Sequence, residues 1–243
     1  MKRSPSPLAH PGLVLIAITI ASASRFGPMA FSPGDDGTHT IASDTLARFL
    51  QSGHPPLTAY RARRHLEASA KGGKLNAQLD AWTDLALDGA FTFEIIQESG
   101  SGLIRNHVLR AALLEEQRSH TTDQIAESAL SPQNYEFRVD EEPAEGELVR
   151  ITLSPRRQSQ MLIAGDAFVR RGDADLVSVE GILSKRPSLW TRRVEVTRRY
   201  ARIDGVRVPV EMQSRADVLL VGGSSFLMTY QYSTINGRAL HAE

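Results

Sequence analysis

The segment Leu75–Glu98, LNAQLDAWTDLALDGAFTFEIIQE, decides the fold class because its apolar and polar residues alternate. Successive side chains of a β-strand point to opposite faces, so this period of two predicts a strand with one buried face. Asp88-Gly89 tolerates the positive φ of a tight turn, and apolar residues alternate again beyond it. We therefore predict one long hairpin over 75–98. Its apolar parity holds Leu75, Ala77, Leu79, Ala81, Leu85 and Leu87, followed by Phe91, Phe93 and Ile95.

Residues 57–71 predict a further strand immediately upstream. Their even positions include Tyr60, Ala62 and Leu66, while the odd positions are polar. Helix propensity is also high here, so a helix is the alternative. The run Lys71-Gly72-Gly73-Lys74 favours the strand because it is a good turn into the hairpin.

The C-terminal half predicts short strands separated by turns. Asp204-Gly205 and Gly222-Gly223 are expected to form hairpin turns, because glycine adopts positive φ without steric cost. Pro209 cannot donate a ladder hydrogen bond, so its strand is expected at a sheet edge or at a bulge. The expected strands are 147–153, 160–170, 175–183, 190–202, 206–213, 215–221 and 225–233.

Two segments predict helices. An amphipathic helix is expected over 40–50. Eight of the twelve residues from 103 to 114 are apolar, which indicates a helix covered on more than one face, with Ser101 as its N-cap. A further short helix is possible around 123–129. The expected fold class is α+β, mostly antiparallel β, with helices on one face of the sheet.

The N-terminus reads as an export signal. Lys2 and Arg3 precede an apolar run over 13–21, and Ala21-Ser22-Ala23 fits the small-x-small pattern of a signal peptidase site. The run is about half of the ~20 residues that span a bilayer, which disfavours a retained anchor. We expect residues 1–23 to be a signal peptide, 24–40 a flexible leader and 41–243 a single domain. The expected location is the periplasm, with no transmembrane span in the mature chain.

Composition excludes several functions. The 243 residues include no Cys, so disulfides, thiolate metal sites and a Cys nucleophile are excluded. Lys plus Arg and Asp plus Glu are 28 each, which gives no bulk charge for nucleic acid, and no nucleic-acid partner is expected. We find no metal-binding spacing among the seven His and no nucleotide or hydrolase motif, so no metal, cofactor or catalytic residue is predicted. A site assembled from distant residues stays open.

Four pieces of the chain resemble a family of exported bacterial proteins, the outer-membrane lipoprotein-sorting or LolA-like superfamily. The resemblance implies an incomplete antiparallel β-barrel, a curved half-barrel, whose apolar concave side is covered by helices and receives acyl chains or another lipidic ligand. No residue here matches a functional position of the best-known carriers, so no site is carried over. The pieces are LTAYRARRHLEA (57–68), ESGSGLIRNHVLRAALLEEQ (98–117), LVSVEGILSKRPSLWTRRVEVTRRYARIDGVRVPVEMQS (176–214) and TYQYSTING (229–237).

The function expected from these observations is a non-catalytic envelope protein that binds or carries a lipid, an acyl chain or a lipoprotein. A strongly curved sheet with an apolar inner face needs either a covering helix or a guest. Plain core packing is the alternative for each candidate lining residue. These candidates are Leu79, Phe91, Phe93, Ile95, Val108, Leu109, Val208, Val210 and Met212.

An arginine-rich stretch gives a second hypothesis. Nine basic residues face three acidic ones over 185–215. Strand alternation places Arg192 and Arg198 on one face and Arg193 and Arg199 on the other. These four are candidates for a basic patch that binds an anionic headgroup, or that docks an envelope protein if the chain is a structural adaptor. The alternative is a solvated face with cross-strand ion pairs.

Overall fold

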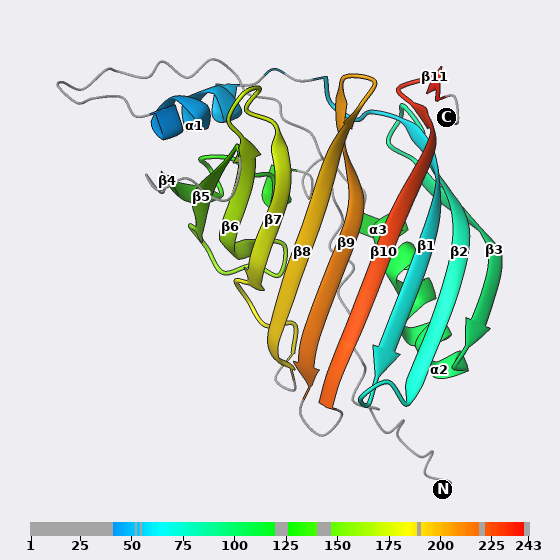
Figure 1. The fold of residues 1–243 in the computed structure, drawn as a ribbon. Coiled ribbons are helices and arrows are strands. Elements are labelled where there is room, and N and C mark those ends of the chain that lie inside the picture. Colours follow the sequence, from blue (N-terminus) through cyan, green and yellow to red (C-terminus); the bar gives the residue numbers. More distant parts are fainter. Residues whose placement is uncertain are drawn as a thin grey trace, which may run out of the picture.

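The structure is a computed structural model that describes residues 41–51, 53, 55–119, 126–139, 147–188, 191–218 and 222–240. The predicted signal peptide and leader lie outside the described residues. Within them, eleven strands form one antiparallel sheet in the order β3-β2-β1-β10-β9-β8-β7-β6-β5-β4, with β11 paired to β10 (Figure 1). The strands are β1 (Tyr60–Ala70), β2 (Leu75–Leu85), β3 (Phe91–Gly100), β4 (Tyr135–Val139), β5 (Leu148–Pro155), β6 (Ile163–Arg170), β7 (Leu176–Leu183), β8 (Thr191–Ile203), β9 (Val206–Val218), β10 (Gly222–Ile235) and β11 (Arg238–Ala239).

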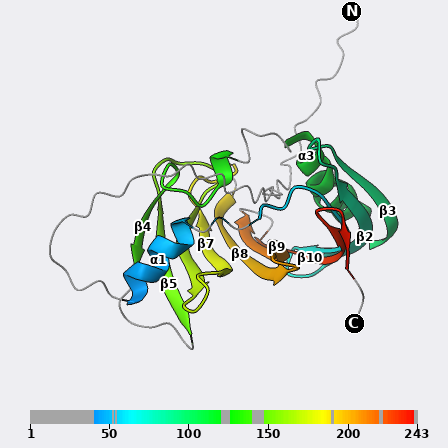
Figure 2. The same cartoon turned by 90° about the horizontal axis from the view of Figure 1, so that it is seen from above.

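The sheet is curved and open. Seen from above, β4 lies at one end of the curve and β3 at the other (Figure 2). These two edge strands do not pair with each other, so the sheet is not closed into a barrel. The predictions of a mostly antiparallel sheet, of the 75–98 hairpin and of the strand before it are confirmed, and the curvature fits a half-barrel.

Helices pack near the two ends of the sheet. The run α2 (Gly102–Ile104), η1 (Arg105–Leu109) and α3 (Arg110–Ser119) packs against β1, β2 and β3. We call that side of the sheet inward and the other side outward. Helix α1 (Ile41–Gln51) lies near β4, β5 and the β6–β7 turn (Figure 2). The helices predicted over 40–50 and 103–116 are thus present.

The second helical run departs from regular α-helix. Its middle segment, η1, is π-helical. Ser101 occupies the N-cap position, but its side chain makes no capping hydrogen bond. Instead, the carbonyl of Ser101 accepts a hydrogen bond from the backbone N–H of Arg105 at 2.9 Å. Single π turns inside helices are frequent at functional sites.

Some strand boundaries differ from the prediction. The predicted strand 206–213 and the described part of the predicted strand 215–221, up to Val218, form one strand. Ser214 and Arg215 connect them, because they pair with Val196 and Ser225 in the neighbouring strands. Backbone ladders continue through polar side chains, so polarity alone does not end a strand. Gly222-Gly223 is not a turn but opens β10, and the residues before it lie outside those described. Strands β4 and β11 were not predicted.

Pro209 lies at a bulge, as predicted. Arg199 of β8 pairs with Glu211 and Tyr200 pairs with Pro209, so Val210 is the extra residue of β9. The pairing of β9 with β10 extends only to Glu211. The sheet therefore requires no ladder hydrogen bond from Pro209, which has no backbone N–H to donate.

The core fills the space between the inward face and the helices. One cluster of buried side chains contains Phe49 of α1, Val108 and Leu109 of η1, and inward residues of β1, β2 and β4–β10. Two smaller clusters lie around Tyr60 and around Val208. A single hydrophobic cluster thus connects the α1 end of the molecule to the α3 end.

Candidate functional site

The inward faces of the central strands form one nearly apolar row. In register from β7 to β1, the row runs through Val179, Arg198, Met212, Met228 and Leu66. None of the five is more than 6% exposed. Four are apolar and one is an arginine, so this row holds a single charged group, at its second position.

The nine predicted lining residues are distributed over three clusters. Leu79, Val108, Leu109 and Met212 are buried in the largest cluster, with Phe93 and Ile95 packed against it. Phe91 belongs to the cluster around Tyr60, whereas Val208 and the partly buried Val210 belong to the third. The structure brings most of them together, but not all. That they contact a ligand stays a prediction.

A buried ion pair that the sequence did not indicate joins the sheet to α3. Arg64 of β1 is 1% exposed, and its Nη1 and Nη2 donate to Oε2 and Oε1 of Glu116 at 2.5 and 2.9 Å. Nη2 also donates to the hydroxyl of Tyr60. The guanidinium stacks over the rings of Tyr230 and Phe91, at 4.7 and 5.1 Å from their centroids. Bidentate geometry and aromatic stacking together hold Arg64 in place.

The charges of this cluster are fixed by their neighbours. Burial raises the pKa of the Tyr60 and Tyr230 hydroxyls, and the charge of Glu116 raises it further against the opposing effect of Arg64. Burial by itself lowers the pKa of Arg64, but Glu116 and the tyrosines outweigh it and raise that pKa above its usual value. The cluster therefore holds one arginine cation, one carboxylate and neutral phenols.

A second buried carboxylate ties α1 to the sheet. Asp175 is 2% exposed and accepts from Arg207 Nε at 2.7 Å and from Arg202 Nε at 3.0 Å. The guanidinium of Arg207 lies over the ring of Phe49 in α1, 5.6 Å from its centroid. Arg48 of the same helix donates to backbone carbonyls of the β6–β7 turn. The helix is thus held by polar contacts as well as by its apolar face.

The predicted basic patch is divided between the two faces. Arg192, Arg193 and Arg199 are exposed, whereas Arg198 is buried. Alternation predicts Arg192 on the face of Arg198, but a register shift between Thr191 and Arg193 turns it to solvent. Arg193 and Arg199 pair with glutamates of the outward face at 3.1 and 3.7 Å, which neutralises part of the patch.

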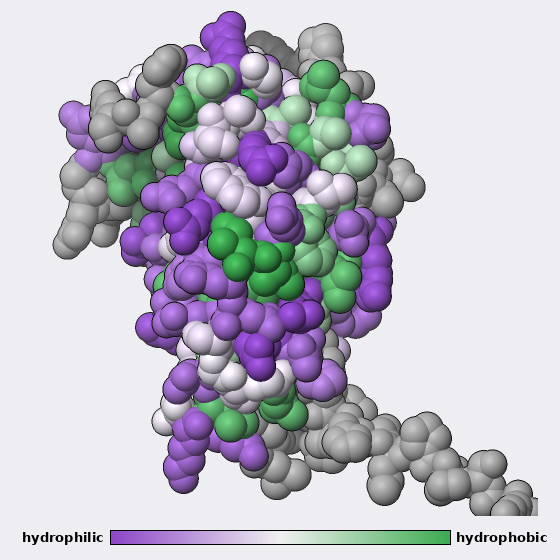
Figure 3. Space-filling view, turned by 90° about the vertical axis from the view of Figure 1, so that its right-hand side faces the viewer, coloured by the Kyte–Doolittle hydropathy of each residue, from purple (hydrophilic) through white to green (hydrophobic). Residues whose placement is uncertain are grey.

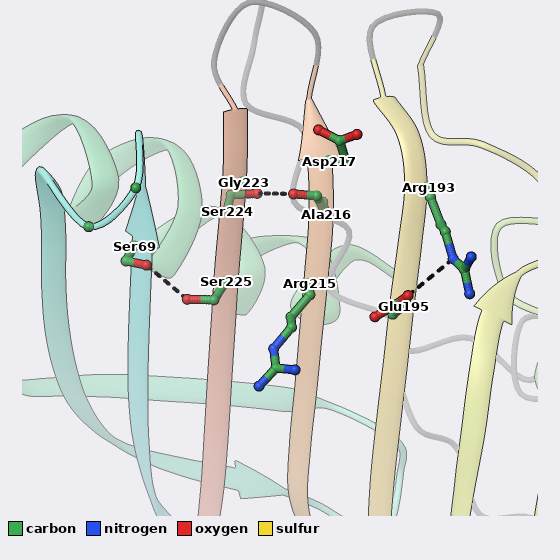
Figure 4. Close-up of a pocket in the computed structure, with 11 residues that line it drawn as sticks. Ser69, Arg193, Glu195, Arg215, Ala216, Asp217, Gly223, Ser224 and Ser225 are labelled. Carbon is green, nitrogen blue, oxygen red and sulfur yellow. Dashed lines mark hydrogen bonds and ion pairs between the residues drawn. The ribbon is translucent and has the colours of Figure 1, made fainter.

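A pocket of about 390 Å³ lies at one end of β8, β9 and β10 (Figure 4). Arg193 and Arg215 line it, together with the carboxylates Glu195 and Asp217, so its charges balance. The other lining residues are Ser69, Gly72, Gly73, Ala216, Gly223, Ser224 and Ser225. Arg193 is the one residue of the predicted patch that lines this pocket.

A hydrogen-bonded network crosses the outward face of β1, β2 and β3. His65 Nδ1 lies 2.9 Å from Oδ1 of Asp80, and its Nε2 lies 2.9 Å from Oε1 of Glu67. Gln97 donates to the other oxygen of Asp80 at 2.6 Å. Hydrogen bonding to Glu67, opposed by some burial and aided by Asp80, raises the pKa of His65.

Two further classes of feature are absent from the described part of the chain. No group of three or more His, Asp or Glu residues there is arranged to hold a metal ion. None of the helices described is long and apolar enough to cross a membrane.

Comparison with known proteins gives distant structural likenesses only. No family model and no curated protein matches the sequence. A DUF1329 family protein from Desulfovibrio piger is 13% identical with a TM-score of 0.40, over 78% of this chain and 90% of that one. A LolA superfamily protein from Nitrosomonas europaea is 12% identical with a TM-score of 0.35, over 82% and 94%. The MucA/MucB complex of Pseudomonas aeruginosa gives 12% identity and a TM-score of 0.21, over 79% and 94%.

The second of these structures belongs to the superfamily that the sequence resembles. At TM-scores of 0.40 and below, the likeness carries no argument about what this chain binds.

Proposed function

We propose that this protein is a non-catalytic binding or carrier protein of the bacterial cell envelope that holds an acyl chain of a lipid or lipoprotein. One observation carries the proposal: a row of inward residues across the central strands is apolar at β7, β9, β10 and β1. The helices pack mainly at the two ends, near β4–β5 and against β1–β3. An acyl chain laid against the central strands would gain about 0.8 kcal/mol for each buried CH₂.

The helical segments serve in this proposal as covers over the inward face. Polar contacts fasten each cover at defined points, Glu116 to Arg64 for α3 and Arg48 to the β6–β7 turn for α1. Such contacts exchange for water at modest net cost when a cover moves. The π-helical segment η1 interrupts the regular α-helix just before α3, and in this proposal the packing of the helical run against the sheet changes there.

The proposal also places the protein outside the cytoplasm. Its support is the sequence pattern of residues 1–23, a basic start, an apolar run and a small-x-small site. N-terminal sequencing of the protein recovered from the periplasmic fraction tests this part. A mature chain that begins at Ser24 is expected, and a cytoplasmic chain that retains Met1 would contradict it.

Native mass spectrometry after mild extraction tests the binding function. We expect a fraction of the mature protein to carry an added lipid mass, and we expect added lipid to raise the melting temperature. Ligand at a hundred times its Kd stabilises a folded protein by about 2.7 kcal/mol. Protein that is always empty, with no gain in melting temperature from any lipid class, would end the proposal.

The exposed arginines of the outward face favour a second candidate, an adaptor that docks an acidic envelope protein. Arg192, Arg193 and Arg199 project from β8, and Arg215 lies beside them at the pocket. Reversal of the first three to glutamate is expected to abolish capture of such a partner, and high salt is expected to weaken it. Arg198 takes no part because it is buried. Capture that survives both changes would rule the adaptor out.

A further inference from the structure

Within the part of the chain that the structure describes, Arg198 lacks the acidic partner that the buried Arg64 and the partly buried Arg207 have. Arg64 is paired with Glu116, and Arg207 is paired with Asp175. Arg198 is 6% exposed, yet no described residue accepts a hydrogen bond from its Nε or Nη2. A buried charge without a partner is strongly unfavourable, and proteins normally pair or neutralise it.

The strand register shows on which face of the sheet the charge of Arg198 lies. It lies on the inward parity of β8, with Val179 opposite on β7 and Met212 opposite on β9. Both neighbours are buried and apolar. Arg199, the next residue, lies on the outward parity and pairs with Glu211 at 3.7 Å. The unpaired cation therefore faces the side on which the proposed acyl chain is held.

The charge of Arg198 acts on two buried phenols, those of Tyr135 in β4 and Tyr230 in β10. Tyr200, two residues along the same strand, packs against the same core cluster, as does Tyr230 of β10. Tyr135 of β4 accepts a hydrogen bond from the backbone N–H of Ile163 at 3.0 Å, which leaves its own proton free to donate. Burial raises the pKa of Tyr135 and Tyr230 against the opposing charge of Arg198, so both remain neutral donors.

A buried guanidinium whose charge reaches two phenols, with no carboxylate of the described residues bonded to it, is suited to the oxygens of one anionic group. We propose that Arg198 binds the anionic head of an amphiphile, a carboxylate or a phosphate, whose apolar chain lies along the inward row. This inference rests on the proposed function, and it narrows the ligand from any lipid to one with a single negative head. The head is buried with the chain, because the guanidinium that binds it is itself buried.

A comparison of oleate with oleyl alcohol isolates the contribution of the anionic head to the affinity, since both compounds carry the same eighteen-carbon tail. Calorimetry with the full chain is expected to show oleate binding at least roughly tenfold tighter than the alcohol, as for a charge-assisted hydrogen bond. Oleyl phosphate tests the phosphate alternative. Acetate and inorganic phosphate, which have no tail, are expected to bind at least about a hundredfold more weakly than oleate.

The Arg198→Met variant removes the charge and keeps an apolar side chain of similar length. It is expected to lose the preference for oleate, with a fall of about tenfold or more in oleate affinity and no change for oleyl alcohol. Arg199→Met is the matched control, with the same change one residue away on the outward face, and it is expected to leave both affinities as they are.

Stability without ligand supplies an independent readout. Because Arg198 carries an unpaired buried charge, Arg198→Met is expected to melt at a higher temperature than the wild type, while Arg199→Met melts close to it. A large fall in the melting temperature of Arg198→Met would show a structural partner and overturn the inference.

The binding outcomes separate the two proposals. Equal affinity of the wild type for oleate and oleyl alcohol, or equal weakening of both in Arg198→Met, overturns the anionic head and leaves lipid binding intact. Binding of neither amphiphile, nor of oleyl phosphate, overturns lipid binding itself. Tail-less anions that bind as tightly as oleate show an anion site without an acyl chain, which contradicts both.

Discussion

Gly165 of β6 and Gly181 of β7 lie opposite each other with their backbones in unusually close approach. A Cβ atom at Gly165 would lie 2.1 Å from the carbonyl oxygen of Glu180, and one at Gly181 would lie 2.3 Å from that of Ala164. Neither contact is possible for a real side chain. At the scale of single residues, the absence of a methyl group thus sets how closely these two strands approach in this half of the curved sheet.

Gly165→Ala is expected to destabilise the protein by about 1–3 kcal/mol, because β6 and β7 must separate to admit the methyl group. Gly172→Ala is the control, since its added Cβ meets nothing within 4 Å. That control is expected to stay within about 0.5 kcal/mol of the wild type in urea unfolding. Equal stability of both variants would show that the close approach is not needed.

His65 gives a pH dependence at the same scale. Its folded pKa is raised above the unfolded value of about 6.5. The stability that its protonated form gains from Glu67 and Asp80 is therefore fully present below about pH 6.5, and it is lost as the pH rises through the folded pKa. The pKa of Asp80 is lowered by hydrogen bonds from Gln97 and His65 despite its burial, so its contribution is lost only in acid.

His65→Gln isolates this contribution. Between pH 6 and pH 8 the wild type is expected to lose stability relative to the variant, and an NMR titration of the His65 ring is expected to give a midpoint above 6.5. Melting temperatures of both proteins across this range provide the measurement. A parallel pH profile for the two proteins would show that the two carboxylates do not stabilise the imidazolium.

At the scale of elements, α3 is held to β1 by the ion pair between Arg64 and Glu116. Both side chains are at most 10% exposed, so the loss of one partner leaves an uncompensated charge in the interior. Burial against the sheet explains why the helical run 103–116 carries more apolar residues than a surface helix needs. Ile104, Val108 and Leu109 are all buried in the contact with the sheet.

Glu116→Gln is expected to cost about 3–5 kcal/mol of unfolding free energy, because Arg64 then lacks its counter-charge. The double variant Arg64→Met/Glu116→Met is expected to recover most of that loss, since it removes both charges. Glu115→Gln, on the adjacent exposed position, is expected to change stability by less than about 0.5 kcal/mol. Denaturant titrations of Arg64→Met, Glu116→Met and the double variant form the cycle, and additive effects of the two changes would exclude a coupled pair.

At the scale of the whole molecule, the open sheet is unified by the largest core cluster. Phe49 in α1 and Leu79 in β2 belong to that cluster although they lie at opposite ends of the sheet.

On the side of the β3 edge, Figure 3 shows apolar surface among hydrophilic side chains. Ile96, Leu103 and Leu114 of β3, α2 and α3 are between 39% and 54% exposed.

The shared cluster predicts a single cooperative unfolding transition. Phe49→Ala and Leu79→Ala are expected to destabilise the fold by about 3–5 and 2–5 kcal/mol, and both are expected to move the same transition. Far- and near-ultraviolet circular dichroism are expected to coincide in the wild type and in both variants. A second transition that only one substitution moves would show that the two ends fold independently.

The sequence by itself determined the features that depend on neighbouring residues. The alternation in 75–98, the Asp204-Gly205 turn and the bulge at Pro209 follow from side-chain period and backbone freedom, which act over a few residues. Local pattern also placed Arg193 and Arg199 on one face. It missed the bulge at Arg192, because a register shift depends on the partner strand.

Contacts between residues that are far apart in the sequence follow from the tertiary packing and not from the local pattern. Alternation places Arg64 on the buried parity but does not encode that α3 brings Glu116 to it from 52 residues away. Likewise, the strand order puts β10 beside β1, and it places Arg198 between the buried apolar residues Val179 and Met212. Strand order and helix placement are set by long-range packing, which a period of two does not specify.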